Sequence, residues 1–298
     1  MIIKKAVIPA AGMGTRFLPV TKSMPKEMLP IINIPAIHYV VDEVIRSGID
    51  DILIITARGK RSIEDYFDDA PELEARLEQN GKSHLLKMVK DASSLADIHY
   101  IRQKEPLGLG DAILRAKHHV NNEPFAVLLG DDLVRSQSPC ISQLMDQFEE
   151  YRASVIAVED VPDEMVSSYG IIRGIGINER TLKINEVVEK PKLEDAPSRI
   201  GAIGRYVFTP EIFRCIESVK PGVGNEIQLA DAINNLIQIQ DVLAYRFEGT
   251  RYDTGNVVGY LQTLIDFAMD NDEIRKDLLP YLNEVLSTFS EHGGRCQK

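Results

Sequence analysis

The sequence predicts an α/β fold in which helices flank a doubly wound, mixed but mainly parallel sheet. Short apolar runs of strand length recur in the first half of the chain, at residues 6–8, 51–56, 98–102 and 125–129. Segments with a helical spacing of apolar residues lie between them, and the links are short. Strand, helix and strand joined in this way form the unit from which parallel sheets are built.

The first expected helix, at residues 35–47, shows the pattern. Its apolar side chains recur at steps of three and four residues, and Gly48 marks its end. A second helix is expected at residues 109–119. Doubly wound sheets bind their ligands beyond the carboxyl ends of the strands, so functional residues are expected directly after the strands.

The second half of the chain is rich in strands at first and helical at its end. Further strands are expected at residues 154–159, 170–173, 184–189, 201–208 and 243–247, and helices at residues 226–239, 255–268 and 274–289. The polar residues 60–97 have helical spacing and indicate a helical insertion. No linker divides the chain, so residues 1–298 are expected to form one domain that ends in helices over residues 256–298. The stretch from Glu291 has no core pattern.

Charge and composition argue against several classes of function. With 34 basic and 45 acidic residues the net charge is −11, which argues against general nucleic-acid binding and against an anionic membrane surface as partner. No apolar run approaches the roughly 20 residues of a membrane span. Cys140, Cys215 and Cys296 lie far apart and lack disulfide or zinc spacing. We therefore expect a cytoplasmic protein.

A small-residue loop that carries two cations follows the first strand. Ala10, Ala11, Gly12 and Gly14 leave backbone N–H groups bare at a strand end, and such groups form an anion-binding concavity. Arg16 and Lys26 then add positive charge on a proline-marked segment that continues neither a helix nor a central strand. A plain strand-to-helix turn with solvated charges is the simpler interpretation, but the two cations favour a site for several negative charges.

Two better-known glycine loops do not fit this segment. A dinucleotide fingerprint needs a small residue where Phe17 stands, and no acid follows near position 30 at a strand end, which argues against a Rossmann dehydrogenase. A Walker A loop needs Gly-Lys-Ser/Thr, and no such triplet follows Gly12.

Two carboxylates and one amide stand where strands are expected to end. Asp131 follows the strand at residues 125–129, with Asp132 beside it as a less favoured candidate, and Asp253 follows the strand at residues 243–247. Such carboxylates can bind Mg²⁺ together with substrate phosphates, or they can cap a helix or a turn. Gln103 offers a donor and an acceptor that match uracil or thymine, although a surface role is the simpler interpretation.

The loop segment resembles the N-terminal signature of sugar-nucleotide pyrophosphorylases, G-x-G-T-R, a proline segment, then P-K-x-M-L-P. Every element is present: Gly12, Gly14, Thr15, Arg16, Pro25, Lys26, Met28, Leu29 and Pro30. The resemblance implies a Rossmann-like nucleotidyltransferase fold of the GT-A kind. It also implies that the loop wraps a nucleoside triphosphate and that Arg16 and Lys26 neutralise its phosphates.

Later motifs resemble the same family in the expected order, up to about residue 260. The resemblance implies that Asp131 and Asp253 are the Mg²⁺ ligands and that Lys190, in VVEKPK, holds a sugar phosphate. The sugar pocket is implied to contain Tyr169, Gly170, Glu189 and Gly204. Gln103 is implied to read uracil with backbone help from Ala10, Ala11 and Gly108. Asn225 and Ala230 depart from the family pattern, which has an acid and a threonine there.

The insertion distinguishes branches within this family. Its form, FDDAPELEARLEQNGKSHLLKMV, resembles the insertion of bacterial-type uridylyltransferases. The resemblance thus implies UTP and glucose 1-phosphate as substrates, direct in-line transfer to give UDP-glucose, and a homodimer or homotetramer. Two alternatives stay open: a thymidylyltransferase, or another sugar 1-phosphate specificity, and a catalytically weak regulatory paralogue that binds nucleotide sugar. Such paralogues tend to lose a phosphate-binding cation or a metal-binding aspartate, and this sequence has kept all of them.

Overall fold

The central element of the fold is a mixed sheet that joins both halves of the chain. The computed structural model describes residues 3–291, and within them the main sheet has nine strands. In spatial order these are β5 (Asp97–Arg102), β4 (Asp51–Thr56), β1 (Lys5–Pro9), β6 (Phe125–Leu128), β11 (Ile200–Phe208), β8 (Ser154–Asp160), β12 (Val242–Arg246), β10 (Thr181–Glu189) and β9 (Gly170–Gly176).

The strand pairings confirm the mixed, mainly parallel sheet. Neighbours β5, β4, β1 and β6 are parallel, as are β8 and β12. Strands β11 and β10 run against their neighbours, so all strands of this sheet but these two point the same way. Strands from residue 5 to residue 246 share one sheet, which supports our proposal of a single domain.

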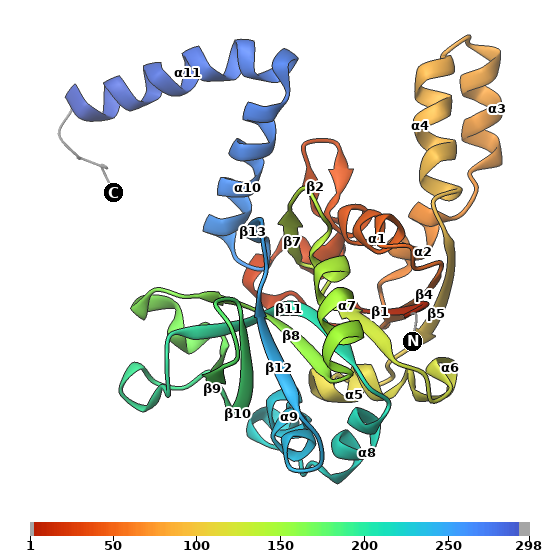
Figure 1. Cartoon of the computed structure of the whole chain (residues 1–298). Helices are drawn as coiled ribbons and strands as arrows, with labels where there is room; N and C mark the ends of the chain where they lie inside the picture. The colour runs from red at the N-terminus through yellow and green to blue at the C-terminus, as the bar shows by residue number, and fades with distance from the viewer. Residues whose placement is uncertain (1–2, 292–298) are drawn as a thin grey trace.

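Helices cover both faces of the sheet, because alternate side chains of the central strands face opposite sides. On one face Ala6, Ile8 and Ile54 pack against α1 (Ala36–Arg46) and α7 (Cys140–Tyr151). On the other face Val7 and Leu53 pack against α5 (Gly108–Leu114), α8 (Glu211–Ser218) and α9 (Leu229–Ile237). Figure 1 shows α8 and α9 on the side of the sheet away from α1.

Two helical segments project from the sheet and its covering helices. The insertion contains α2 (Arg61–Phe67) and a hairpin of α3 (Pro71–Gln79) and α4 (Ser83–Ser93). The chain ends with α10 (Val257–Asp270) and α11 (Asp272–Glu291), and α11 turns away from the body (Figure 1). Within residues 3–291 no helix is long and apolar enough to cross a membrane. Residues 292–298, most of the tail expected to lack a core pattern, lie outside the described residues, as does Cys296.

The strands and helices expected from apolar patterns are confirmed, with shifts at several boundaries. Strand β9 ends three residues later and β10 begins three residues earlier than expected. The helix expected at residues 109–119 is divided into α5 and α6 (Lys117–Val120), where Ala116 N donates to Ile113 O and tightens the backbone. The helix expected from residue 226 begins at Leu229. Ile227 is extended instead, because its backbone bonds with Leu107 and Gly110.

The structure also contains elements that were not predicted, among them helices α7 and α8 and the short strands β7 (Asp132–Arg135) and β13 (Thr250–Asp253). Strands β7 and β13 pair with each other in a separate antiparallel sheet, in which Asp253 lies opposite Asp132. A small hairpin of β2 (Pro30–Ile31) and β3 (Ile34–Pro35) leads into α1. The pairing of β7 with β13 brings the segment after Asp253 to the carboxyl end of β6.

Candidate active site

Three cavities lie along the carboxyl edge of the parallel strands and share walls. The first, the loop cavity (about 430 Å³), is lined by Gly12, Thr15, Lys22, Arg58, Lys60 and Gln103, among others. The second, the central cavity (about 310 Å³), also contains Gly12 and Gln103 and adds Lys26, Gly108 and Asp131. The third, the sheet cavity (about 250 Å³), shares Asp131 and adds Arg16, Lys190 and Asp253. The three therefore form one trench with Asp131 at its inner junction.

The loop after β1 shapes the start of this trench. It folds into three short 3-10 turns, Thr15–Phe17, Val20–Lys22 and Lys26–Met28. Gly14 has φ of 64°, a left-handed conformation that glycine adopts without strain. Thr21 Oγ1 donates to Gly14 O at 2.7 Å, which closes the turn. Arg16 follows on an exposed segment, and its Nη1 donates to Gly255 O at 3.4 Å.

Lys26 and Asp131 form an ion pair at the junction of the central and sheet cavities. Lys26 Nζ lies 2.5 Å from Asp131 Oδ2, and both side chains are about one fifth exposed. Burial by itself would lower the pKa of Lys26, but the carboxylates of Asp131 and Glu27 raise it above its usual value. Burial would raise the pKa of Asp131, yet the Lys26 ammonium lowers it. Both groups are therefore charged at neutral pH, and an ammonium faces the trench.

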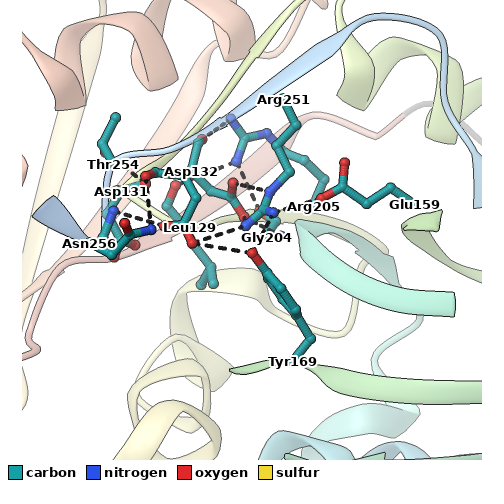
Figure 2. A network of polar contacts seen from close by, with 12 residues as sticks. Leu129, Asp131, Asp132, Glu159, Tyr169, Gly204, Arg205, Arg251, Thr254 and Asn256 are labelled. Carbon is teal, nitrogen blue, oxygen red and sulfur yellow. Dashed lines mark hydrogen bonds and ion pairs between the residues drawn. The ribbon is translucent and has the colours of Figure 1, made fainter. Parts of the chain in front are cut away.

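Asp253 lies beside Asp131 although 122 residues separate them in the sequence. Asp131 Oδ2 and Asp253 Oδ1 both lie within 3.0 Å of the point that a Cβ on Gly255 would occupy. Thr254 holds this arrangement, because its N and its Oγ1 donate to Asp131 O at 3.0 and 2.7 Å (Figure 2). The two carboxylates thus lie side by side, and their approach to the backbone requires glycine at position 255.

Arg251 is a buried hub of this site that sequence reasoning missed. Its guanidinium donates to Asp132 Oδ1 at 2.5 Å, to Glu159 Oε1 at 2.7 Å and to Tyr169 Oη at 2.9 Å (Figure 2). Burial would lower the pKa of Arg251, but these acidic neighbours, Asp132 foremost, raise it. Tyr169 Oη in turn donates to Asp253 Oδ2 at 3.2 Å. Arg251 therefore positions the tyrosine that holds Asp253.

The carboxylate of Asp132, the less favoured candidate metal ligand, is bonded within the protein. Its Oδ2 accepts from Gly204 N at 2.8 Å, and its carboxylate pairs with Arg251. A Cβ on Gly204 would lie 2.8 Å from both Asp132 Oδ2 and Leu129 Cβ. Glycine at 204 is thus required by the packing of the wall, and its place in a sugar pocket stays a prediction.

The side chain of Gln103 is buried and fixed in one orientation. Its Nε2 donates to Asp111 Oδ2 at 2.7 Å and to Gly108 O at 3.2 Å. Because a carboxylate only accepts, the NH₂ group must face Asp111. The amide donors are therefore engaged within the protein, and Oε1 is the atom that remains for a ligand. The sequence predicted that Gln103 offers both a donor and an acceptor to the base; the structure corrects this prediction, because only the acceptor is available.

The residues predicted to bind the sugar and its phosphate all line the sheet cavity. These are Tyr169, Gly170, Glu189, Lys190 and Gly204. Lys190 directly follows β10 and has φ of 44°, a left-handed conformation that is strained for lysine. Its Nζ lies 3.1 Å from Glu189 Oε1, and the lysine side chain is about half exposed. The cation thus stands at the cavity wall beside an acid that orients it.

A second lysine and acid pair lies behind Lys26 and was also missed. Lys60 Nζ donates to Glu27 Oε2 at 2.7 Å, and both side chains are buried. Burial raises the pKa of Glu27, while Lys60 opposes that shift. Lys60 lines the loop cavity, and Glu27 lines the central cavity. Glu27 therefore fixes Lys60 as a further cation at the trench, beside Arg16, Lys26 and Lys190.

Two predicted nucleotide contacts, Ala10 and Gly14, are not among the residues that line the three cavities. Ala10 is buried and its N donates to Ile55 O at 2.9 Å, so its N–H belongs to the sheet. Gly14 shapes the loop through its left-handed turn. Ala11, Gly12, Thr15, Gln103 and Gly108 line the loop or central cavities. Binding of nucleotide by any of these residues stays a prediction.

The chain matches characterised proteins over nearly its whole length. The family model described as nucleotidyl transferase matches residues 5–268. A relative from Bacillus subtilis (strain 168), named UTP–glucose-1-phosphate uridylyltransferase, is 52% identical over 285 residues, which cover 96% of this chain and 98% of that protein. A protein of the same name from Staphylococcus epidermidis is 51% identical over 283 residues, 95% and 98% of the two chains.

Solved structures agree with this placement. A UDP-glucose pyrophosphorylase complexed with UDP-glucose has a TM-score of 0.84 at 43% identity, covering 91% of this chain and all of that one. A UTP-bound enzyme from Acinetobacter baumannii has a TM-score of 0.87 at 39% identity, with 95% and 99% covered. A thymidylyltransferase structure from Bacillus anthracis, at 22% identity and a TM-score of 0.67, shares the fold alone. This chain therefore belongs to the nucleotidyl transferase family.

Proposed function

We propose that this protein transfers a uridylyl group from UTP to glucose 1-phosphate and releases UDP-glucose and pyrophosphate. The observation that carries this proposal is the junction at Asp131, where a cavity lined by Gln103 meets a cavity lined by Lys190. A base with its triphosphate and a sugar with its phosphate can then approach each other from opposite ends of one trench. Relatives about half identical over nearly the full length carry the matching name.

The reaction needs positioning and charge neutralisation more than a protein nucleophile. A phosphate oxygen of glucose 1-phosphate attacks the α-phosphorus of UTP in line, and the bond from that phosphorus to the bridging oxygen breaks. The electron pair leaves with pyrophosphate. Phosphoryl-type transfers of this kind are catalysed largely by orientation and by stabilising charge.

Four cations can share this task along the trench. Lys26 stands at the junction of the cavities and is proposed to stabilise the α-phosphate as its charge changes, with Arg16 beside it. Lys60, held by Glu27, is proposed to face the departing pyrophosphate in the loop cavity. Lys190 is proposed to hold the attacking phosphate, while Glu189 accepts hydrogen bonds from sugar hydroxyls.

The base is proposed to bind in the central cavity against Gln103. Its Oε1 accepts from the uracil N3–H, since the amide donors are engaged by Asp111 and Gly108. Gly12 and Thr15, which line the loop cavity, are proposed to contact the phosphates. Tyr169, Gly170 and Gly204 are proposed to line the glucose pocket.

Asp131 and Asp253 are proposed to hold Mg²⁺. The two carboxylates line the same cavity, and a hard cation such as Mg²⁺ prefers one or two carboxylates plus substrate phosphates. Asp131 Oδ2 also pairs with Lys26, and Asp253 Oδ1 accepts from Gly255 N. When bound there, the ion would neutralise phosphate charge. Thr254 and Tyr169 keep the two carboxylates in place. The homodimer or homotetramer implied by the family resemblance stays a prediction.

Pyrophosphate release with different nucleotides tests this function. We expect the highest kcat/KM with UTP and glucose 1-phosphate. CTP has no N3–H to donate to Gln103, so its kcat/KM should fall on the order of 10⁴-fold, as for sites built to bind a missing donor. With dTTP, which keeps N3–H but adds a methyl group and lacks the ribose 2′-hydroxyl, the loss should be about tenfold to 100-fold. Equal or faster turnover of dTTP would instead indicate a thymidylyltransferase.

A further inference from the structure

A cluster of metal-ligand side chains lies at the end of the sheet opposite the trench. Asp51 is the first residue of β4, His99 is the third residue of β5, and His119 lies on α6. One ligand atom from each lies within 4.8 Å of the others. These residues come from three elements, and the trench begins at the far, carboxyl ends of the same strands. The catalytic proposal uses none of them.

The spacing of the three ligand atoms is close to that of a bound transition metal. His119 Nε2 lies 2.7 Å and His99 Nε2 4.0 Å from Asp51 Oδ1. Tetrahedral zinc with bonds of about 2.0–2.1 Å holds its ligand atoms about 3.3 Å apart. The two observed distances lie on either side of that value. The exposed side chain of His99 lies on the edge strand of the sheet, and its rotation can shorten the longer distance. The shorter distance is a hydrogen bond between His119 and Asp51, which a bound ion would replace.

The backbone around the cluster is held firmly. Lys5 Nζ donates to His119 O and Val120 O at 3.1 and 3.2 Å, and it also pairs with Glu123 at 3.2 Å. These contacts anchor α6 to β1, and β4 pairs in parallel with both β1 and β5. Two of the three ligands are therefore fixed before any ion arrives. The His99 and His119 rings lie 5.0 Å apart at a tilt of 57°, and no ring stacking competes with binding.

We propose that Asp51, His99 and His119 form a second metal site, selective for a divalent transition metal such as Zn²⁺. Two imidazoles and one carboxylate suit zinc and copper rather than Mg²⁺, which prefers oxygen ligands. A fourth position remains open to water, since the side chain of His99 is 60% exposed. Bound metal would join β4, β5 and α6 at this edge and stabilise the folded state, by an amount that rises with the logarithm of the free metal concentration once the site is filled.

Isothermal titration of tag-free protein with ZnCl₂, in buffer with excess MgCl₂ to occupy Asp131 and Asp253, tests this site. We expect one zinc ion per chain and a thermal midpoint that rises with zinc. His99→Ala and His119→Ala should each weaken zinc binding by about tenfold or more. His118→Ala, which alters the exposed neighbour on α6, and Cys296→Ser should leave it unchanged.

Activity provides an independent readout. Because the cluster and the trench lie at opposite strand ends, His99→Ala should keep the pyrophosphate-release rate of the parent protein. Loss of zinc binding with retained activity supports the second site whatever the nucleotide preference proves to be. Zinc binding that persists in His99→Ala, or no binding by the parent protein at submillimolar zinc, would overturn the proposal. His99 is exposed, so its replacement keeps the test valid should His119→Ala fail to fold.

Discussion

Replacing Lys26 by alanine is expected to lower turnover on the order of 10²- to 10³-fold, the usual cost of removing a preorganised group that stabilises charge in the transition state. Lys26 Nζ stands against Asp131 at the junction of the cavities, and its raised pKa keeps it charged at neutral pH. The loss should appear in kcat at saturating UTP and Mg²⁺, measured by pyrophosphate release.

Two comparisons separate this role from a structural one. Lys82→Ala removes an exposed lysine at the tip of the α3–α4 hairpin and should leave kcat unchanged. Circular dichroism should show the same fold for both variants. If Lys26→Ala raised KM for UTP but kept the parent kcat, Lys26 would bind ground state and transition state equally, and the proposed role in catalysis would be wrong.

The largest expected change in stability follows the replacement of Arg205 by methionine, which should lower the free energy of unfolding by about 3–5 kcal/mol. Arg205 is fully buried and donates to Glu43 Oε2 at 2.8 Å and to Asp132 O at 2.6 Å. Without it the Glu43 carboxylate stays buried and unpaired. Urea-induced unfolding followed by circular dichroism measures the change.

A surface pair provides the matched control for Arg205. Arg61 and Asp65 form an exposed pair one helical turn apart, so Arg61→Ala should cost at most about 0.5 kcal/mol. The double variant Glu43→Leu/Arg205→Met should recover part of the loss, since removing both charges leaves none buried alone. A loss in Arg205→Met no larger than in Arg61→Ala would contradict the argument from burial.

Local patterns sufficed to predict the main sheet but not the small elements. Buried strands such as β4 and β6 are continuous apolar runs, and their period and length are visible in the sequence. Strands β7 (DLVR) and β13 (TRYD) have four residues each, and five of these eight residues are polar or charged even without the tyrosine. Their pairing depends on a partner more than a hundred residues away. Helix α7 was missed although Ile141, Leu144 and Phe148 have helical spacing.

The candidate site divides in a similar way. Asp131 and Gln103 follow predicted strands, so their place at the sheet edge was predictable from chain order and the parallel pairing. The partners were not predictable. Arg251 is one charged residue among many in the sequence, and only the fold brings it to Asp132, Glu159 and Tyr169. The buried acceptor Asp111, which fixes the orientation of Gln103, likewise has no local signal.

That two phosphorylated substrates meet beside Asp131 is tested most directly by a crystal structure with UDP-glucose and Mn²⁺ in place of Mg²⁺. The expected result is an anomalous difference peak for a manganese ion that is bound by Asp131 and Asp253. Uracil should lie at Gln103, and the diphosphate should lie between Lys26 and Lys190. A manganese peak away from both carboxylates, or a diphosphate outside the trench, would contradict this arrangement.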